Sequence, residues 1–389
     1  MIGLLRYALR SLWARRVTTL ATAGGIALLV FVLAASSMLA SGMRRTLARA
    51  GDESRAVVIG HDQFAEHRSS VPASVLGRVA AAPGIRKDAS GQPLVTGETV
   101  THLMLGEASK AHISTLQIRG VDANVLALRP NVRVVQGRML QTGTAEAIVG
   151  RGLVGTSPEL AIGRSIELSV SKPATIVGVF DAGGTVLDSE IWVDLHTARS
   201  AFGMEGSLSS VTAQLESPAA YDAFALPLTE DKQTGLDVMR ESAYYNRLAE
   251  GVATIIITLG VLEALIFSLG AICATMIVFY GAVAQRRREV GVLRALGFRR
   301  RSILAAFLAE SVVLSLAGGA VGMGCALFTP LLDFHLVNFV TGQDVAFHFH
   351  PDLDTLLRAV LVATSVGLVG GLFPAVRAAR MAPVVAMRA

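Results

Sequence analysis

The chain has 389 residues, of which 52% are hydrophobic and 17% charged, and its mean hydropathy is +0.53. This composition is too apolar for an ordinary soluble protein and too polar for one built of membrane spans alone, so both classes are excluded. The net charge of +5 does not indicate a nucleic-acid-binding protein, because the excess arginine lies beside long apolar segments.

The first apolar segment, 17–43, contains no charged residue and follows four arginines. A helix rises about 1.5 Å per residue and the hydrocarbon of a bilayer is about 30 Å thick, so roughly 20 apolar residues can span it. A cleaved signal peptide is the alternative, but its apolar region usually has only about 7 to 15 residues. We therefore expect an uncleaved transmembrane helix.

The long polar segment 44–250 predicts a mixed α/β domain. Apolar and polar side chains alternate in 164–170, which is the period of a half-buried strand. A second strand is predicted at 174–181, before turn-forming residues, and a short helix at 196–203 that stops at its final glycine, Gly203.

Ser157 in this domain precedes Pro158, a pattern typical of a helix N-cap, which explains the serine better than a role as a nucleophile. The stretch 44–115 shows helical patches and several prolines and glycines, without a clear boundary. It could pair with 205–250 to form a second lobe, into which the lobe that begins near residue 115 is inserted.

Three further apolar runs predict three more spans, and the two cysteines, Cys273 and Cys325, fall inside them. The polar domain therefore has no disulfide, and a core of its own must stabilise it. The expected segments are 1–16 (cytoplasmic), 17–43 (span 1), 44–250 (outer domain), 251–285 (stalk and span 2), 286–301 (cytoplasmic loop), 302–332 (span 3), 333–357 (outer loop), 358–376 (span 4) and 377–389 (cytoplasmic tail).

The charges of the connecting segments predict the orientation. The segments 1–16, 286–301 and 377–389 carry +4, +6 and +3, whereas 44–250 and 333–358 carry −3 each. Because positive loops stay in the cytoplasm, both termini are expected inside and both negative segments outside. The expected fold is an α-helical membrane protein with four transmembrane helices and a mixed α/β extracytoplasmic domain inserted between helices 1 and 2.

The loop after the second span is basic but also partly apolar. Arginines there satisfy the positive-inside rule, yet Val290, Leu293 and Leu296 are spaced three apart and predict one apolar face of a short helix. Such a helix could rest in the lipid headgroups or insert into a groove on a soluble partner. We favour the partner, because a span joined to this helix would transmit the partner's movement. The predicted helix and its end comprise Glu289, Val290, Gly291, Leu293, Arg294, Ala295, Leu296, Gly297 and Phe298.

Other polar residues near the spans offer weaker signals. Glu310 lies nine residues after Arg301, so it could pair with a cytoplasmic arginine or form an intramembrane polar site. Glu263 falls at the outer boundary, where solvation explains it. The pairs Gly318/Gly322 and Gly367/Gly371 have GxxxG spacing, which permits close helix packing within the chain or in a dimer.

No metal or catalytic residue is predicted. His348 and His350 lie two apart, but a zinc site would need two more ligands, and Asp352 and Asp354 are merely nearby. The sequence contains no HExxH, GxSxG or CxxC motif, so an intramembrane protease or redox enzyme has no support.

Several stretches resemble MacB/FtsX-type ABC transporter permeases. QRRREVGVLRALGFRRRSILAAFLAESVVLSLAGGAVG is similar to the loop and third span of that family, and FPAVRAARMAPVVAMRA to its cytoplasmic tail. In the outer domain, IRGVDANVLALRPNVRVVQGRML, AEAIVGRGLVG, IGRSIEL, TIVGVFD and DSEIWVDLHTARSAFG follow, in order, the pattern of the MacB-type periplasmic core domain.

This resemblance implies a non-enzymatic permease subunit in the bacterial inner membrane that forms a homodimer with a second copy. Glu289–Phe298 would be the coupling helix that docks onto a separate cytoplasmic ATPase, which binds the ATP and magnesium. The sequence agrees in that it contains no GxxxxGK[ST] phosphate loop, and its start close to the first span suggests an ATPase on another polypeptide.

Two functions follow from the resemblance. A transporter would move an amphiphile, peptide, lipid or lipoprotein from the outer leaflet, with a periplasmic adaptor and an outer-membrane protein as further partners beside the membrane lipids. An FtsX-like signalling scaffold would activate a cell-wall hydrolase instead. The large outer domain favours transport.

Overall fold

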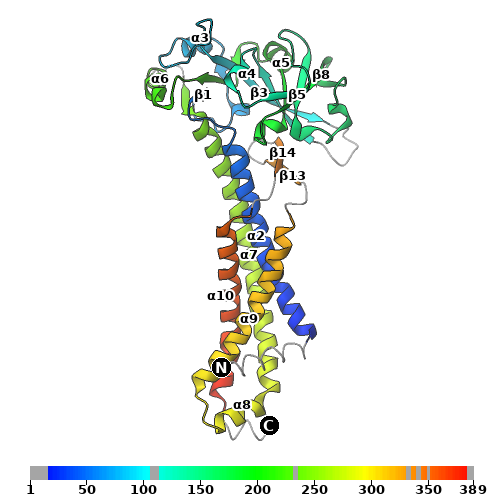
Figure 1. The fold of residues 1–389 in the computed structure, drawn as a ribbon, viewed down its shortest axis with the longest axis vertical. Helices are drawn as coiled ribbons and strands as arrows, with labels where there is room; N and C mark the ends of the chain where they lie inside the picture. The colour runs from blue at the N-terminus through cyan, green and yellow to red at the C-terminus, as the bar shows by residue number, and fades with distance from the viewer. Residues whose placement is uncertain are drawn as a thin grey trace. The chain divides into compact units, whose positions relative to one another are not determined.

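The computed structural model describes residues 16–105, 114–230, 235–329, 334–338, 343–347 and 351–382. It separates into two compact units (Figure 1). The helical unit comprises Met1–Ser41, Thr254–Leu332 and Phe349–Ala389, and the sheet unit comprises Gly42–Ala253 and Asp333–His348.

The helical unit is built from long apolar helices. Within the described ranges, four helices are long and apolar enough to cross a membrane, which confirms the four predicted spans. The second is much longer than its span, because it begins at Glu241 rather than at residue 251, and the fourth begins at Leu353 rather than at residue 358. The helices are α2 (Arg16–Ala48), α7 (Glu241–Gln285), α8 (Arg287–Ala295), α9 (Arg300–Leu327) and α10 (Leu353–Arg380).

Glycines allow these helices to approach closely. An added Cβ at Gly322 would lie 2.1 Å from the carbonyl oxygen of Ala27 on α2, and one at Gly318 would lie 2.7 Å from that of Ala23. On α10, Gly367 packs in the same way against α9, where the Ser311 hydroxyl donates to its carbonyl at 2.7 Å. Both predicted glycine pairs therefore serve packing within the chain.

The sheet unit contains a mixed sheet of ten strands in the order β12-β1-β11-β3-β4-β9-β6-β8-β5, with β7 paired to β8. Most neighbours are antiparallel, but β4 and β9, like β6 and β8, run parallel. The strands of this sheet are β1 (Arg55–Gly60), β3 (Val95–Leu105), β4 (Ser114–Val121), β5 (Arg133–Gly137), β6 (Glu146–Gly150), β7 (Ser165–Ser169), β8 (Lys172–Asp181), β9 (Glu190–Asp194), β11 (Ser210–Gln214) and β12 (Leu236–Arg240).

Short helices and strands surround this sheet. They are β2 (Val71–Pro72), which pairs with β10 (Ser207–Leu208), the helices α3 (Val75–Ala80), α4 (Val125–Leu128), α5 (Leu195–Phe202) and α6 (Tyr221–Thr229), and the 3₁₀ helices η1 (Glu66–Arg68), η2 (Arg151–Leu153), η3 (Pro158–Leu160), η4 (Val186–Ser189) and η5 (Pro218–Ala220).

The sheet has two hydrophobic cores, and their residues agree with the two predicted lobes. One core lies among β1, β11, β12, α3 and α6, so the stretch 44–115 does pair with 205–250. The other lies among β4, β6, β7, β8 and β9, within the inserted segment. The lobes are not separate sheets, however, because β3 and β4 pair antiparallel over seven residues and make the sheet continuous.

Local predictions in this unit were mostly correct. Strands β7 and β8 and helix α5 lie where the patterns placed them; α5 ends at Gly203 with φ 69°, and the Ser157 hydroxyl accepts a hydrogen bond from the backbone N–H of Glu159. In 44–115 the structure has three strands, β1, β2 and β3, and its helices beyond the end of α2 are short, since η1 spans three residues and α3 six. All six residues of β1 are buried, so it shows no alternation of apolar and polar side chains.

The segment expected as an outer loop contains a hairpin of β13 (Phe334–Asn338) and β14 (Gln343–Phe347). Strand β14 lies beside β4 and η4, so this part of the chain belongs to the sheet unit. His348 and His350, considered above as zinc ligands, lie outside the described residues.

Candidate coupling site

Helix α8 occupies the basic loop. It begins at Arg287, two residues before the predicted start, and ends at Ala295, so Leu296 is its C-cap. Glu289 lies in the first turn, where its carboxylate complements the positive end of the helix dipole. Gly297 has φ 93°, a left-handed conformation that suits glycine and ends the helix as predicted.

The apolar residues of α8 do not form one face, which corrects the sequence interpretation. Val290 is only 3% exposed and packs with Phe279 of α7 and with Ile303 and Phe307 of α9. Leu293 is half-buried. The first turn of α8 therefore packs against the chain's own helices, because hydrophobic side chains from α9 and α10 surround it there.

A second apolar surface of α8 faces outward. Val292 is 48% exposed and Leu296 is 72% exposed, and their spacing of four places them on the same side. Phe298, just beyond the end of the helix, is 42% exposed. We call these three residues the exposed apolar turn.

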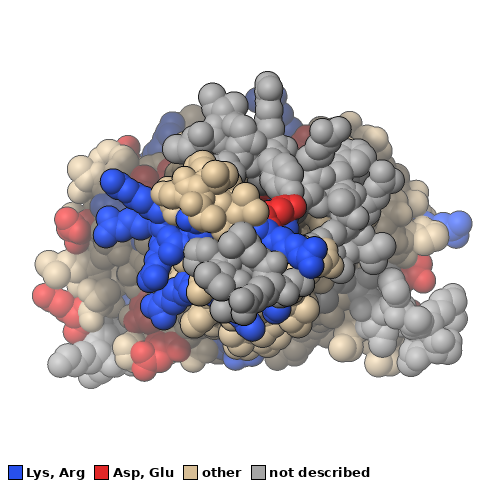
Figure 2. All heavy atoms as spheres, turned by 90° about the horizontal axis from the view of Figure 1, so that it is seen from below, with Lys and Arg blue, Asp and Glu red and all other residues tan. Residues whose placement is uncertain are grey.

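Arginines surround the exposed apolar turn. Figure 2 shows lysine and arginine side chains gathered on this face of the molecule. The exposed arginines of this region are Arg287 and Arg288 at the start of α8 and Arg299, Arg300 and Arg301 at the start of α9. An apolar centre with a basic rim suits a partner surface that is apolar in the middle and acidic at its edge.

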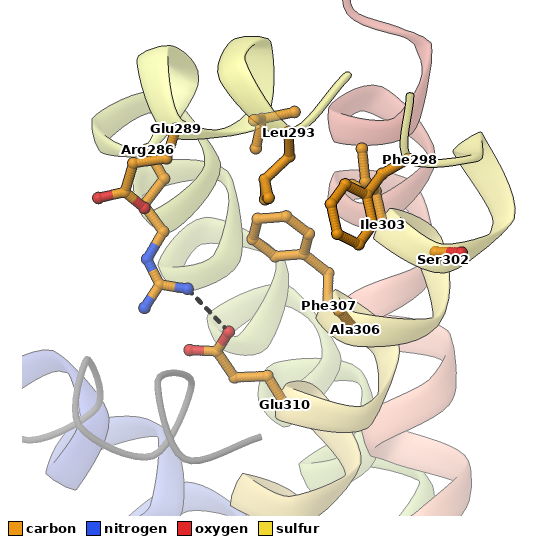
Figure 3. Close-up of a pocket in the computed structure, with 10 residues that line it drawn as sticks. Arg286, Glu289, Leu293, Phe298, Ser302, Ile303, Ala306, Phe307 and Glu310 are labelled. Carbon is orange, nitrogen blue, oxygen red and sulfur yellow. Dashed lines mark hydrogen bonds and ion pairs between the residues drawn. The ribbon is translucent and has the colours of Figure 1, made fainter. Parts of the chain in front are cut away.

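A pocket of about 60 Å³ lies between α8 and α9 (Figure 3). Leu293, Ile303 and Phe307 point into it, and Phe298 closes one side. At its other end, Arg286 Nη1 lies 3.0 Å from Glu310 Oε2, and both side chains are largely buried. Of the two alternatives for Glu310, the structure shows a pairing with an arginine, Arg286, and this pair fixes the end of α7 to α9. Glu263 is exposed on α7.

The sheet unit holds a second cluster of charged side chains, which the sequence did not reveal. At its centre is Arg119 on β4, which is fully buried and binds three glutamates. Its Nη2 donates to Glu66 at 3.0 Å and its Nε to Glu190 at 2.8 Å, and its Nη1 donates to Glu98. Gln117 and the Trp192 indole also donate to Glu190, and Ser210 donates to Glu66.

The cluster continues from Glu98 to α7. Arg129 Nη2 donates to Glu98 at 3.1 Å, and its Nη1 donates at 2.7 Å to Glu241, the first residue of α7. Arg55 Nε donates to the same Glu241 carboxylate at 2.5 Å. We call these seven residues the ion network: Arg55, Arg119, Arg129, Glu66, Glu98, Glu190 and Glu241.

The electrostatics of the ion network favour the charged forms of Glu98 and Arg119. Burial alone would raise the pKa of Glu98, but the guanidinium groups of Arg129 and Arg119 outweigh it and lower that pKa to about 2. Burial would likewise lower the pKa of Arg119, but the surrounding carboxylates raise it well above its usual value. The opposite charges of Glu98 and Arg119 therefore stabilise each other inside the sheet unit.

Among the described residues, one group has the spacing of a metal site: His61, Asp62 and Asp237. The His61 Nδ1 lies 2.8 Å from Asp237, and its Nε2 lies 3.5 Å from Asp62, so the imidazole is already held by carboxylates. The hydrogen bond with Asp237 raises the pKa of His61, which favours an imidazolium paired with two carboxylates.

His67, beside Glu66, has the opposite environment and gives a prediction. Burial, with smaller contributions from the charges of His102 and Arg68, lowers its pKa from 6.5 to about 4. Between these values the unfolded chain binds more protons than the folded one, so stability falls as the pH falls below about 6.5. We expect His67→Gln to reduce the loss of stability between pH 7 and pH 5 by about 2 kcal/mol, measured by thermal melting of the detergent-solubilised chain.

His61→Gln is the control for this prediction. Because the pKa of His61 is raised in the folded chain, its contribution to stability is present at low pH and lost as the pH rises. Replacing His61 should therefore not reduce the loss of stability between pH 7 and pH 5. Equal acid sensitivity in wild type and His67→Gln would contradict the assignment to His67.

Two family models match the chain. The FtsX-like permease C-terminal model matches residues 261–383. The MacB-like periplasmic core domain model matches residues 17–230, which is more than half of the chain. The chain belongs to the MacB family of ABC transporter permeases. The FtsX-like part of this MacB-type permease contains α8, its pocket and the pair of Arg286 with Glu310, and the MacB-like part contains every member of the ion network except Glu241.

Curated relatives match over part of their length. The macrolide export ATP-binding/permease protein MacB 1 of Aeromonas hydrophila is 25% identical over 315 residues, which cover 75% of this chain and 46% of that protein. The ABC transporter permease YknZ of Bacillus subtilis is 28% identical over 229 residues, 56% of this chain and 54% of its own. This MacB-type permease thus spans about half the length of the curated relatives it matches.

A solved structure is also similar. The periplasmic region of MacB from Actinobacillus actinomycetemcomitans matches with 14% identity and a TM-score of 0.38, over 50% of this chain and 92% of that one.

Proposed function

We propose that this MacB-type permease couples ATP hydrolysis by a separate ATPase to movement of its sheet unit, and that the ATPase docks on the exposed apolar turn of α8. The observation that carries this proposal is that Val292, Leu296 and Phe298 are all exposed within seven residues of the chain, between two groups of exposed arginines, 287–288 and 299–301. Burying each such side chain in a partner contributes about 1.5–3 kcal/mol, and the arginines steer an acidic groove toward it.

The opposite side of α8 supports the same role. Val290 and Leu293 fasten the helix to α9, and Arg286 binds Glu310 next to them. A partner that displaces α8 would therefore move α7 and α9 with it. Helix α7 has 45 residues, about 68 Å, and contributes residues to both units, so its displacement would reach the sheet unit.

The proposed setting follows from the distribution of charge. Both termini and α8 lie in the cytoplasm, and the sheet unit lies outside the inner membrane. The resemblance to MacB/FtsX-type permeases adds a second copy, which completes a homodimer. ATP and magnesium bind in the partner and supply the chemical energy, while this chain supplies docking and movement. An amphiphile, peptide, lipid or lipoprotein is extracted or exported, with an adaptor and an outer-membrane protein as further partners. The MacB-like match of the sheet unit favours transport over the activation of a hydrolase.

Substitution of the exposed apolar turn tests the docking site. We expect Val292→Asp and Leu296→Asp each to weaken co-purification of the ATPase with the tagged chain more than tenfold, because a buried unpaired carboxylate replaces an apolar contact. Leu293→Asp would be less diagnostic than these two variants, because it also disrupts the pocket between α8 and α9.

Val170→Asp is the matched control, because Val170 is 90% exposed in the sheet unit. The variants and the control should reach the membrane in equal amounts. ATPase recovery with Leu296→Asp at the wild-type level would rule out this docking surface.

A further inference from the structure

We propose that the ion network is the joint through which movement of α7 reaches the sheet, with Glu241 as the positioning residue on the α7 side. This inference rests on the proposed function, because it concerns how a displacement of α7 is passed on. The seven residues of the ion network take part neither in the proposed docking site nor in the helix packing of the helical unit.

The first turn of α7 follows strand β12 directly in the chain, and the network adds side-chain bonds to that connection. Glu241 is fully buried, and its two carboxylate oxygens are shared between Arg129 and Arg55. Its Oε2 also accepts the backbone N–H of Asp52 at 3.1 Å. One turn later, the Tyr244 hydroxyl accepts the backbone N–H of Glu66 at 3.0 Å. A rotation or pull of α7 therefore acts directly on charged partners in the sheet.

On the sheet side, the network leads to the centre of the sheet. From Glu241 the hydrogen bonds pass through Arg129 to Glu98 on β3, and from there through Arg119 on β4 to Glu190 on β9. The pairing of β3 with β4 is where the two lobes join. A displacement that enters at Glu241 thus reaches both lobes through consecutive charge-assisted hydrogen bonds.

The end of α2 is tied to the same joint. Arg55 Nη2 donates to the carbonyl of Ala50 at 3.4 Å. An added Cβ at Gly51 would lie 2.6 Å from the Cα of Ser242, so the backbones after α2 and at the start of α7 are in contact. Both helices that lead to the sheet unit therefore meet the network within a few residues.

The buried ion pairs of the network suit a mechanical connection better than they suit stabilisation of the fold. A buried ion pair stabilises a fold little more than well-packed apolar residues would, but its partners have a fixed geometry and resist separation. The exposed pair of Arg44 and Glu250, one at the end of α2 and the other in α7, is by contrast screened by water and transmits little.

Hydrogen exchange measured by mass spectrometry tests the joint in the full chain, in nanodiscs with its ATPase, with and without ATP plus vanadate. Glu241→Gln and Glu190→Gln form a matched pair, because each replaces one buried acidic side chain of the network, but Glu190 lies on β9 and accepts its hydrogen bonds from Gln117, Arg119 and Trp192, none of them in α7. In wild type, nucleotide should change exchange in the first turns of α7 and in β3 and β4.

With Glu241→Gln we expect the nucleotide-dependent change in hydrogen exchange to persist in α7 but to fall at least fivefold in β3 and β4. With Glu190→Gln the nucleotide-dependent change in β3 and β4 should persist. An undiminished response of β3 and β4 in Glu241→Gln would overturn the joint and leave the proposed function standing. No response of α7 in wild type would instead overturn the proposed function and the joint with it.

Should either glutamine variant fail to fold, Glu241→Asp and Glu190→Asp replace the pair. Each keeps the charge but is one methylene shorter, so the bonds to arginine loosen. The same difference between the α7 position and the β9 position is expected, and equal responses of β3 and β4 in both would overturn the joint.

Discussion

Replacement of Arg119 by methionine is expected to prevent stable folding of the sheet unit. The substitution preserves much of the side chain's volume but removes the partner of three glutamates whose side chains are at most 6% exposed. Removing one partner of a buried ion pair typically costs about 3–5 kcal/mol, and here three carboxylates lose their shared cation. A whole domain is stable by only about 5–15 kcal/mol.

Limited proteolysis and thermal melting of the membrane-inserted chain would measure this effect. Arg151→Met is the control, since Arg151 is 68% exposed and pairs with Asp181 at 2.8 Å on the surface. Surface pairs contribute about 0–1 kcal/mol, so the control should melt close to wild type. A sheet unit as protease-resistant in Arg119→Met as in Arg151→Met would contradict the central role of Arg119.

Gly322→Ala is expected to disrupt the helical unit. The added methyl group would lie 2.1 Å from the carbonyl oxygen of Ala27, and the backbone of α2 cannot yield as a flexible side chain could. The helices must therefore move apart, which weakens the contacts along their interface. Overpacking of this kind costs about 1–3 kcal/mol or more, and we expect a lower melting temperature and a lower yield in detergent.

Gly324→Ala, two residues away on the same helix, is the matched control. No atom lies within 4 Å of its added Cβ, and alanine favours a helix over glycine by about 1 kcal/mol. This variant should be at least as stable as wild type. Similar melting temperatures for the two variants would show that close packing of α9 on α2 does not limit stability.

Features set by a contiguous stretch could be predicted from the sequence. Each of the four spans is one apolar run, and the ends of α5 and α8 depend on Gly203 and Gly297 alone. The pairing of Glu310 with Arg286 was also accessible, because the chain returns to the same membrane boundary after a short loop.

The sequence could not show which side of α8 packs inward, because the helix carries apolar side chains on two sides. Spacing alone favoured Val290, Leu293 and Leu296 as one face. Val290 is turned inward by Phe279, Ile303 and Phe307. Val292 and Leu296 are left outside, and only the packed structure distinguishes the two sets.

The ion network was inaccessible for a different reason. Its members extend from Arg55 to Glu241 in the sequence, and only the folded sheet unit brings them together, in part through the pairing of β3 with β4 and of β4 with β9. A charged residue in a strand, such as Arg119 or Glu98, normally indicates a solvent-facing position, so the sequence pattern pointed away from burial.

The continuous pairing of β3 with β4 limits how relatives of this protein could exchange the inserted lobe. The inserted lobe looks removable, because the chain enters and leaves it at neighbouring strands. It nevertheless contributes Arg119 and Glu190, while Glu66 and Glu98 belong to the other lobe. A chimera that grafts a foreign lobe must therefore carry arginines at the equivalents of Arg119 and Arg129, or it leaves Glu66 and Glu98 in the recipient without the basic partners they have here.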